Sequence, residues 1–242
     1  WTQILNILEE KAKNGVEVRV MYDDMGCLPL LPENYQKYLE SLNIKGVVFN
    51  KLKMFKGIFM NNRDHRKITV IDGNIAYTGG LNLSDEYINK KIKYGYWKDN
   101  AIKLQGNSVW NLTIMFLSLW NSYKKEDKDY LKFKTTDNLK IKPNGYLSAY
   151  ASVPINGVLE GEDVYLNIIN KATKYVYIIT PYLIIDTDMI NSIILAFKRG
   201  VDVRIVIPGI PDKKIVYDLT MSYVKNLVDA GIKVYTYTPG FI

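Results

Sequence analysis

The feature that most constrains the fold is an internal repeat. Residues 15–20, Gly-Val-Glu-Val-Arg-Val, align with residues 200–205, Gly-Val-Asp-Val-Arg-Ile, at an offset of 185 residues (200 − 15). In both places an apolar amphipathic stretch precedes the glycine and alternating apolar residues follow it, which predicts a helix, a stop and then a strand. Two copies of such a unit predict an α/β protein in which helices cover a sheet.

The two copies are unequally complete. Copy two has an apolar stretch at 175–185 that predicts a strand before its helix, whereas copy one begins inside its helix at residues 4–13. Copy one continues for 21 residues from Ile44 to His65 (65 − 44), but 10 residues follow Ile232 (242 − 232). We therefore expect any counterpart of His65 to fall at or beyond the end of this sequence.

A charged segment separates the copies. Residues 124–145 are rich in lysine and acidic residues and end in Pro-Asn-Gly, a turn signal. We interpret this segment as a solvated connector, and the alternative is a role for its lysines at a lipid surface. If the boundary lies at the end of this segment, the chain consists of a first unit at 1–145 and a partial second unit at 146–242.

The net charge and the counts of cysteine and histidine limit the kinds of partner and metal site that we expect. The net charge of +7 predicts an anionic partner, either nucleic acid, acidic lipid headgroups or a phosphorylated substrate, although a basic surface can also serve solubility alone. The single cysteine, Cys27, excludes an internal disulfide, and one cysteine with one histidine argues against a structural zinc site. No uncharged apolar run reaches the roughly 20 residues of a membrane span.

The single histidine lies in the stretch "HRKITVIDGNIAYTGGLN", which begins at His65. The pattern predicts a strand from His65, a tight turn at Asp72-Gly73 and a returning strand. Side chains i and i+2 share a face of a strand, so we expect His65 and Lys67 to project together while Ile68 points the other way. Such a pair suits a phosphoryl group, because the ammonium holds the anion while the imidazole attacks phosphorus or carries a proton.

The residues after this hairpin extend the pattern. The pair Gly79-Gly80 lets a ligand approach the backbone, Asn82 offers an amide donor, and residues 84–87, Ser-Asp-Glu-Tyr, predict a helix start whose N–H groups can face an anion. Taken singly, each residue has a plainer interpretation: a turn for the glycines, a core or surface side chain for His65, solvent exposure for Lys67 and turn chemistry for Asp72.

Two other groups of residues have both a structural and a functional interpretation. Asp23-Asp24 follows a predicted strand and is interpreted as a turn or helix cap, with a metal pair as the alternative. The tryptophans Trp97, Trp110 and Trp120, with Phe116 and Leu117, are predicted to form core, with an apolar wall for acyl chains as the alternative.

The ordered set H-x-K-x4-D-x6-GG-x-N resembles the first signature motif of the phospholipase D superfamily. The stretches "YTGGLNLSDEY", "GYWKD", "TPYLIID" and "GVDVRIVIPGIPD" resemble its bacterial cardiolipin synthase branch. The resemblance implies an α/β fold with a phospholipase D-like mixed β-sheet flanked by helices. It also implies two related units, of which the second is incomplete and lacks its own H-x-K motif.

The chemistry implied by the resemblance is phosphatidyl transfer, which forms cardiolipin from two phosphatidylglycerols through a phosphohistidine, without metal or cofactor. His65 is then the nucleophile, and a histidine from the second motif protonates the leaving alcohol. Asp72 supports the fold of the motif, while Asp99 in "GYWKD" orients the imidazole, unless it is a turn aspartate. The implied site comprises His65, Lys67, Asp72 and Asp99 for catalysis, with Lys67, Gly79, Gly80 and Asn82 for phosphate binding.

The resemblance also implies the partners. These are an anionic phospholipid substrate, phosphatidylglycerol, and a membrane surface, with no nucleic acid. The parent protein is expected at the cytoplasmic face of the cell membrane, and these 242 residues are expected to be soluble and nearly inert until the rest of the full-length chain supplies the second motif. Two alternatives are a metal-independent phosphodiesterase or nuclease of the same superfamily, which the basic charge suits, and a non-catalytic module that binds anionic phospholipid.

Overall fold

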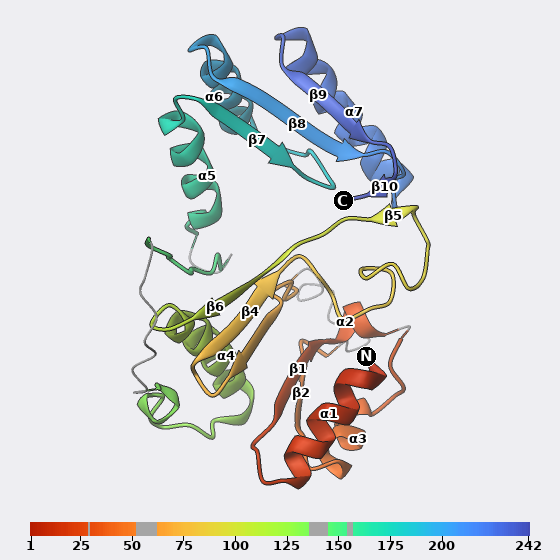
Figure 1. The fold of residues 1–242 in the computed structure, drawn as a ribbon, viewed down its shortest axis with the longest axis vertical. Helices are drawn as coiled ribbons and strands as arrows, with labels where there is room; N and C mark the ends of the chain where they lie inside the picture. Colours follow the sequence, from red (N-terminus) through yellow and green to blue (C-terminus); the bar gives the residue numbers. More distant parts are fainter. Residues whose placement is uncertain (29, 52–61, 136–144, 154–156) are drawn as a thin grey trace. The chain divides into compact units, whose positions relative to one another are not determined.

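The computed structural model describes residues 1–28, 30–51, 62–135, 145–153 and 157–242. The chain is mixed α/β and divides into two compact units (Figure 1). Unit 1 comprises Trp1–Leu81 and Ala101–Ala149, and unit 2 comprises Asn82–Asn100 and Tyr150–Ile242. The change between Ala149 and Tyr150 lies four residues after the predicted boundary at 145 (149 − 145), but the segment 82–100 belongs to unit 2.

Unit 1 contains a parallel pair of strands and an antiparallel sheet. Its helices are α1 (Thr2–Lys13), α2 (Asp24–Cys27), α3 (Tyr35–Ser41), α4 (Val109–Lys124) and the short 3-10 helix η2 (Leu131–Phe133). Its strands are β1 (Arg19–Asp23), β2 (Lys45–Phe49), β3 (Ile68–Ile71), β4 (Ile75–Gly79) and β6 (Ala101–Gln105). β1 pairs with β2, and the antiparallel sheet has the order β3-β4-β6.

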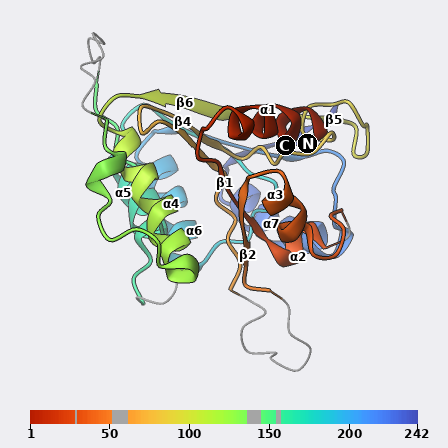
Figure 2. The same ribbon diagram turned by 90° about the horizontal axis from the view of Figure 1, so that it is seen from below.

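Two clusters form the core of unit 1. α1 and α3 pack on β1 through buried Leu5 and Leu39, with Val20 of β1 against them (Figures 1 and 2). α4 packs on β3 and β4 around buried Ala76 and Val109. In α4 the predicted core residues Leu117 and Trp120 are buried, while Trp110 and Phe116 are half-buried.

Unit 2 is built on a three-stranded parallel sheet in the order β7-β8-β9. Its strands are β5 (Tyr96–Trp97), β7 (Tyr175–Ile179), β8 (Asp202–Pro208), β9 (Lys233–Tyr237) and β10 (Gly240–Phe241), and its helices are α5 (Glu160–Lys171), α6 (Thr187–Lys198) and α7 (Lys214–Asp229). β5 pairs with β10 in parallel, which ties the segment 82–100 to the end of the chain. The three helices and the sheet share one core around Ile193, Ile205 and Leu227.

The structure reproduces the repeat in detail. α1 and β1 correspond to α6 and β8, with Thr2 matching Thr187 at the predicted offset of 185 (187 − 2). The glycine after each helix has a φ of 86°, in the left-handed region that a glycine adopts without strain. Arg19 pairs with Lys45 across β1 and β2, and the matching Arg204 pairs with Lys233 across β8 and β9.

The strand predicted at 175–185 is too long. β7 ends at Ile179, and the remaining residues form a loop. Pro181 cannot donate a ladder hydrogen bond, and Leu183 instead donates its backbone N–H to Thr220 Oγ1 of α7 at 3.2 Å. The apolar run therefore continues into core packing rather than into the sheet.

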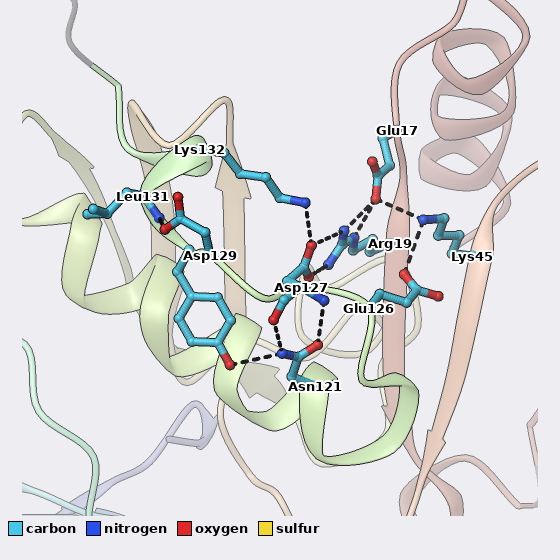
Figure 3. Close-up of polar contacts among 10 residues, drawn as sticks. Glu17, Arg19, Lys45, Asn121, Glu126, Asp127, Asp129, Leu131 and Lys132 are labelled. Atoms are coloured by element: carbon cyan, nitrogen blue, oxygen red, sulfur yellow. Dashed lines mark hydrogen bonds and ion pairs between the residues drawn. The ribbon is translucent and has the colours of Figure 1, made fainter.

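The charged connector is not simply solvated. The Asp127 side chain is 1% exposed, and it accepts hydrogen bonds from Arg19 Nη1 at 2.5 Å and Nη2 at 3.2 Å (Figure 3). Lys132 Nζ lies 2.7 Å from Asp127 Oδ1. Arg19 lowers the pKa of Asp127 to about 2, against the opposing effect of burial and with help from Lys132. Residues 136–144 of the predicted connector lie outside the described residues.

Across the described ranges, no helix combines the length and the apolar character that crossing a membrane requires.

Candidate active site

His65 and Lys67 lie in the segment that leads into β3. The His65 side chain is exposed, and Lys67 is half-buried. Lys67 Nζ donates a hydrogen bond to the backbone carbonyl of His65 at 2.6 Å, so the ammonium lies beside the histidine residue. Ile68 and Val70 pack into the core against α4, which leaves the alternate positions of the strand on the exposed face.

The prediction that the strand starts at His65 is wrong, because β3 begins at Ile68. Ile68 pairs with Thr78 of β4, and β4 ends one residue later at Gly79. The described register of β3 and β4 therefore begins at Ile68, and residues 65–67 precede it. The two candidate side chains thus lie in the segment that leads into the sheet.

Asp23 fixes the backbone just before His65. As the N-cap of α2 it accepts hydrogen bonds from the backbone N–H groups of Met25 and Gly26. Its Oδ2 also accepts the backbone N–H of Asp64 at 3.1 Å, and its Oδ1 lies 3.3 Å from Arg63 Nη1. The predicted cap role of Asp23 is confirmed, and the tie to the histidine segment is an addition that spacing in the sequence did not reveal.

Asp64 and Arg66 form an ion pair in the same segment. Arg66 Nε donates to Asp64 Oδ1 at 2.8 Å. Burial raises the pKa of Asp64, but the hydrogen bonds from Arg66 outweigh this and leave that pKa below its ordinary value. Both side chains line a cavity of about 60 Å³ together with apolar residues of β1, β3 and α4.

Asp72 and Gly73 form the predicted tight turn of the hairpin. Their φ values are 52° and 61°, and Asn74 N donates to Ile71 O at 3.0 Å, the geometry of a type I′ turn. A Cβ on Gly73 would lie 2.1 Å from the carbonyl oxygen of Phe133. The turn thus requires glycine for space as well as for conformation.

The glycine pair and the asparagine fall at the junction of the two units. Gly79 ends β4 and pairs with Ala101 of β6, and exposed Gly80 follows. Asn82 belongs to unit 2, where its side-chain amide donates to the hydroxyl of Tyr87 at 2.6 Å. Tyr87 is a site neighbour that no sequence signal identified.

The helix start predicted at 84–87 is wrong. This segment consists of turns, closed by hydrogen bonds such as Lys90 N to Asp85 O at 2.9 Å. The Ser84 hydroxyl donates to the Glu86 carboxylate within the segment. The backbone bonds of the segment span five residues, from Lys90 N to Asp85 O, and three, from Asn89 N to Glu86 O, and not the four of an α-helix, so the segment closes turns instead of starting a helix.

Asp99 follows β5 in unit 2 and is exposed. Its Oδ1 accepts the backbone N–H of Asn100 at 2.7 Å, a local turn contact. Burial raises the pKa of Tyr87, and the carboxylate of Asp99 adds to this while the hydrogen bond from Asn82 opposes it. The half-buried Trp97 packs against Tyr87 with ring centroids 4.3 Å apart. The predicted role of Asp99 toward His65 stays a prediction.

The described residues hold no cluster of three or more histidine, cysteine or acidic side chains placed to bind a metal ion. Asp23 is engaged as a helix cap and with Arg63, as described above.

Comparison with known proteins places the chain in a family. The family model described as "Cardiolipin synthase, PLD-like domain" matches residues 2–102 and 165–242. An uncharacterized protein of Streptococcus mutans is 48% identical over 242 residues, which are all of this chain and 52% of that protein. The cardiolipin synthase of Alkalihalophilus pseudofirmus is 36% identical over 241 residues, which are 99% of this chain and 48% of that enzyme.

One solved structure shows the same fold. The phosphatidylserine synthase of Haemophilus influenzae superposes with a TM-score of 0.53 at 17% identity, covering 97% of this chain and 65% of that protein. The chain spans about half the length of the curated relatives it matches. On the family model and these relatives, the chain belongs to the family of PLD-like cardiolipin synthase domains.

Proposed function

We propose that this chain contributes the nucleophilic half of a phospholipase D-type phosphatidyltransferase that forms cardiolipin from two phosphatidylglycerols. The observation that carries the proposal is an exposed His65 with the Lys67 ammonium beside it, just before the first residue of β3, in a chain of this family. The proposal treats the two repeat copies as related phospholipase D-like units that act together.

In the proposed reaction, an imidazole nitrogen of His65 attacks the phosphorus of the donor lipid. The bond from phosphorus to the leaving glycerol oxygen breaks, that oxygen takes a proton, and a phosphohistidine remains. The glycerol hydroxyl of a second phosphatidylglycerol then attacks phosphorus and gives its proton to the group that protonated the first alcohol, while the bond from phosphorus to the His65 nitrogen breaks. No metal or cofactor takes part in this scheme.

The other predicted residues support this step. Lys67 and Asn82 hold the phosphoryl oxygens, and the glycine pair Gly79-Gly80 lets the lipid phosphate approach the backbone. Asp72 maintains the hairpin, and Asp99 orients the imidazole of His65. The sequence contains one histidine, so the second imidazole, which protonates the leaving alcohol, comes from outside these 242 residues.

A donor whose leaving group needs no proton tests the nucleophile without the second imidazole. We expect phosphatidyl-p-nitrophenol, labelled with ³²P, to leave an acid-labile, alkali-stable label on the chain in the presence of a chelator. His65→Ala should abolish the label, and Lys67→Ala should reduce it at least tenfold, which corresponds to about 1.4 kcal/mol of transition-state stabilisation. Lys103→Ala, which removes an exposed lysine of β6, is the matched control and should label normally.

With phosphatidylglycerol as donor, the same chain should turn over very slowly. Rapid chelator-resistant synthesis of cardiolipin by the isolated monomer would contradict the need for a second imidazole. Label that persists in His65→Ala would refute the nucleophile.

A further inference from the structure

The parallel sheet of unit 2 has one covered face and one open face. Val203, Ile205 and Ile207 of β8 are buried in the core shared with α5, α6 and α7. Side chains alternate along a strand, so the neighbouring residues point to the opposite face. That open face carries Tyr175, Tyr177 and Ile179 from β7, Asp202, Arg204 and Val206 from β8, and Lys233 and Tyr235 from β9.

The open face exposes large aromatic and aliphatic side chains to solvent. Tyr175 is 62% exposed, Tyr177 52%, Ile179 62% and Tyr235 46%. Parallel sheets are generally covered on both faces, and a contiguous exposed apolar patch marks an interaction site. Among the described residues of unit 2, the helices α5, α6 and α7 all pack into the core on the other side of β7-β8-β9.

The repeat shows what covers the matching face in unit 1. Arg19 of β1 corresponds to Arg204 of β8, and each bonds the acidic residue two places before it, Glu17 and Asp202. In unit 1 the Arg19 side chain is 8% exposed and also binds Asp127, whereas the Arg204 side chain is 46% exposed.

The cover in unit 1 is α4 and the segment that follows it. The Arg19 guanidinium lies 5.3 Å from the ring centroid of Trp120 in α4 and 5.1 Å from that of Phe133. Met21, two residues after Arg19, lines a cavity with Phe116 and other residues of α4. In unit 2 the position that matches Met21 is Val206, on the open face.

We propose that the open face of the unit 2 sheet is the docking surface for a helix followed by a carboxylate, the combination that α4 and Asp127 provide in unit 1. The apolar side of the helix covers the tyrosines and Val206, and the carboxylate pairs with Arg204. Relatives of about twice this length carry enough chain to supply such a segment. The inference stands apart from the proposed catalysis, because it uses no residue of the candidate active site.

A peptide of residues 107–133 of this chain is a suitable probe, since it contains α4, Asp127 and Phe133. With a fluorescein label, it should bind the 242-residue chain saturably by anisotropy. Arg204→Gln should weaken binding roughly tenfold, the loss expected for one charge-assisted pair. Asp127→Asn in the peptide should have the same effect, and the two changes together should cost no more than either alone.

Lys225→Gln is the matched control, because it removes one positive charge from an exposed ion pair on α7, and it should bind the peptide normally. Circular dichroism verifies that each variant is folded. Absence of saturable binding would overturn the proposal, as would binding that ignores Arg204→Gln, which indicates exchange with α4 of unit 1. Arg204-dependent self-association, or Arg204-dependent binding to phosphatidylglycerol vesicles without peptide, would assign the face to another occupant and equally overturn it.

Discussion

At the scale of single residues, the most informative side chain outside the candidate active site is Asp127. It is nearly inaccessible to solvent, yet it is ionised because Arg19 and Lys132 both bind its carboxylate (Figure 3). A buried carboxylate contributes to stability only while it keeps its charge and its partners. This makes Asp127 a measurable link between pH and the stability of unit 1.

The direction of that link follows from the pKa. The pKa of Asp127 falls from 3.8 to about 2 on folding, so its contribution is complete above pH 3.8 and is lost as the pH falls through 2. The contribution at neutral pH is about 1–2 kcal/mol, the lower value allowing for solvent screening. We expect Asp127→Asn to lower the free energy of unfolding by that amount at pH 7, measured by urea unfolding with tryptophan fluorescence.

The pH series provides the control. The difference between the original chain and Asp127→Asn should shrink steadily below pH 4 and be smallest near pH 2. Glu10→Gln removes an exposed carboxylate that lies 3.5 Å from Lys11 and should leave the unfolding midpoint unchanged at pH 7. A difference between the chains that stays constant from pH 7 to pH 2 would show that ionisation of Asp127 is not involved.

At the scale of elements, the β3–β4 hairpin depends on Gly73 for two separate reasons. Its φ of 61° costs an alanine about 1–2 kcal/mol, and a Cβ there would also press on the Phe133 carbonyl. Gly106 has a φ of 89° but open space around its Cβ position. We expect Gly73→Ala to lower the free energy of unfolding by about 3 kcal/mol and Gly106→Ala by about 1 kcal/mol.

Urea unfolding of the two alanine variants measures this difference directly. Equal losses would mean that the backbone conformation alone matters and that the Phe133 segment moves aside freely. A larger loss for Gly73→Ala should come with easier proteolysis near Phe133, because that segment must shift to admit the methyl group.

The elements also show which features the sequence could predict. The repeat, the glycine helix stops and the Asp72-Gly73 turn follow from local rules, and the structure confirms them. The start of β3 depends on where the partner strand ends, and the cap-like residues 84–87 lie in turns closed by backbone hydrogen bonds to residues further along the chain. The pair of Arg19 and Asp127 spans 108 residues, so no local pattern could reveal it.

At the scale of the whole molecule, the chain uses one structural unit twice in different surroundings. Both copies place an arginine at the same strand position, opposite a lysine on the next strand and beside an acidic residue. In unit 1 a helix and a buried carboxylate complete the environment of that arginine. In unit 2 the described residues leave the arginine side chain exposed. Its removal should therefore lower the free energy of unfolding less in unit 2 than in unit 1.

Matched substitutions of these arginines test that difference. Arg19→Gln removes the bidentate partner of buried Asp127 and the ring contacts with Trp120 and Phe133. Because Lys132 still pairs with Asp127, we expect a loss of about 3 kcal/mol in the free energy of unfolding, the low end for a broken buried pair. Arg204→Gln loses the exposed pair with Asp202 and the exposed contact with the Tyr177 ring, and it should leave the urea midpoint nearly unchanged. Equal losses at the two positions would mean that the sheet face around Arg204 is already covered in solution. That result would contradict the inferred difference in burial between the two arginines.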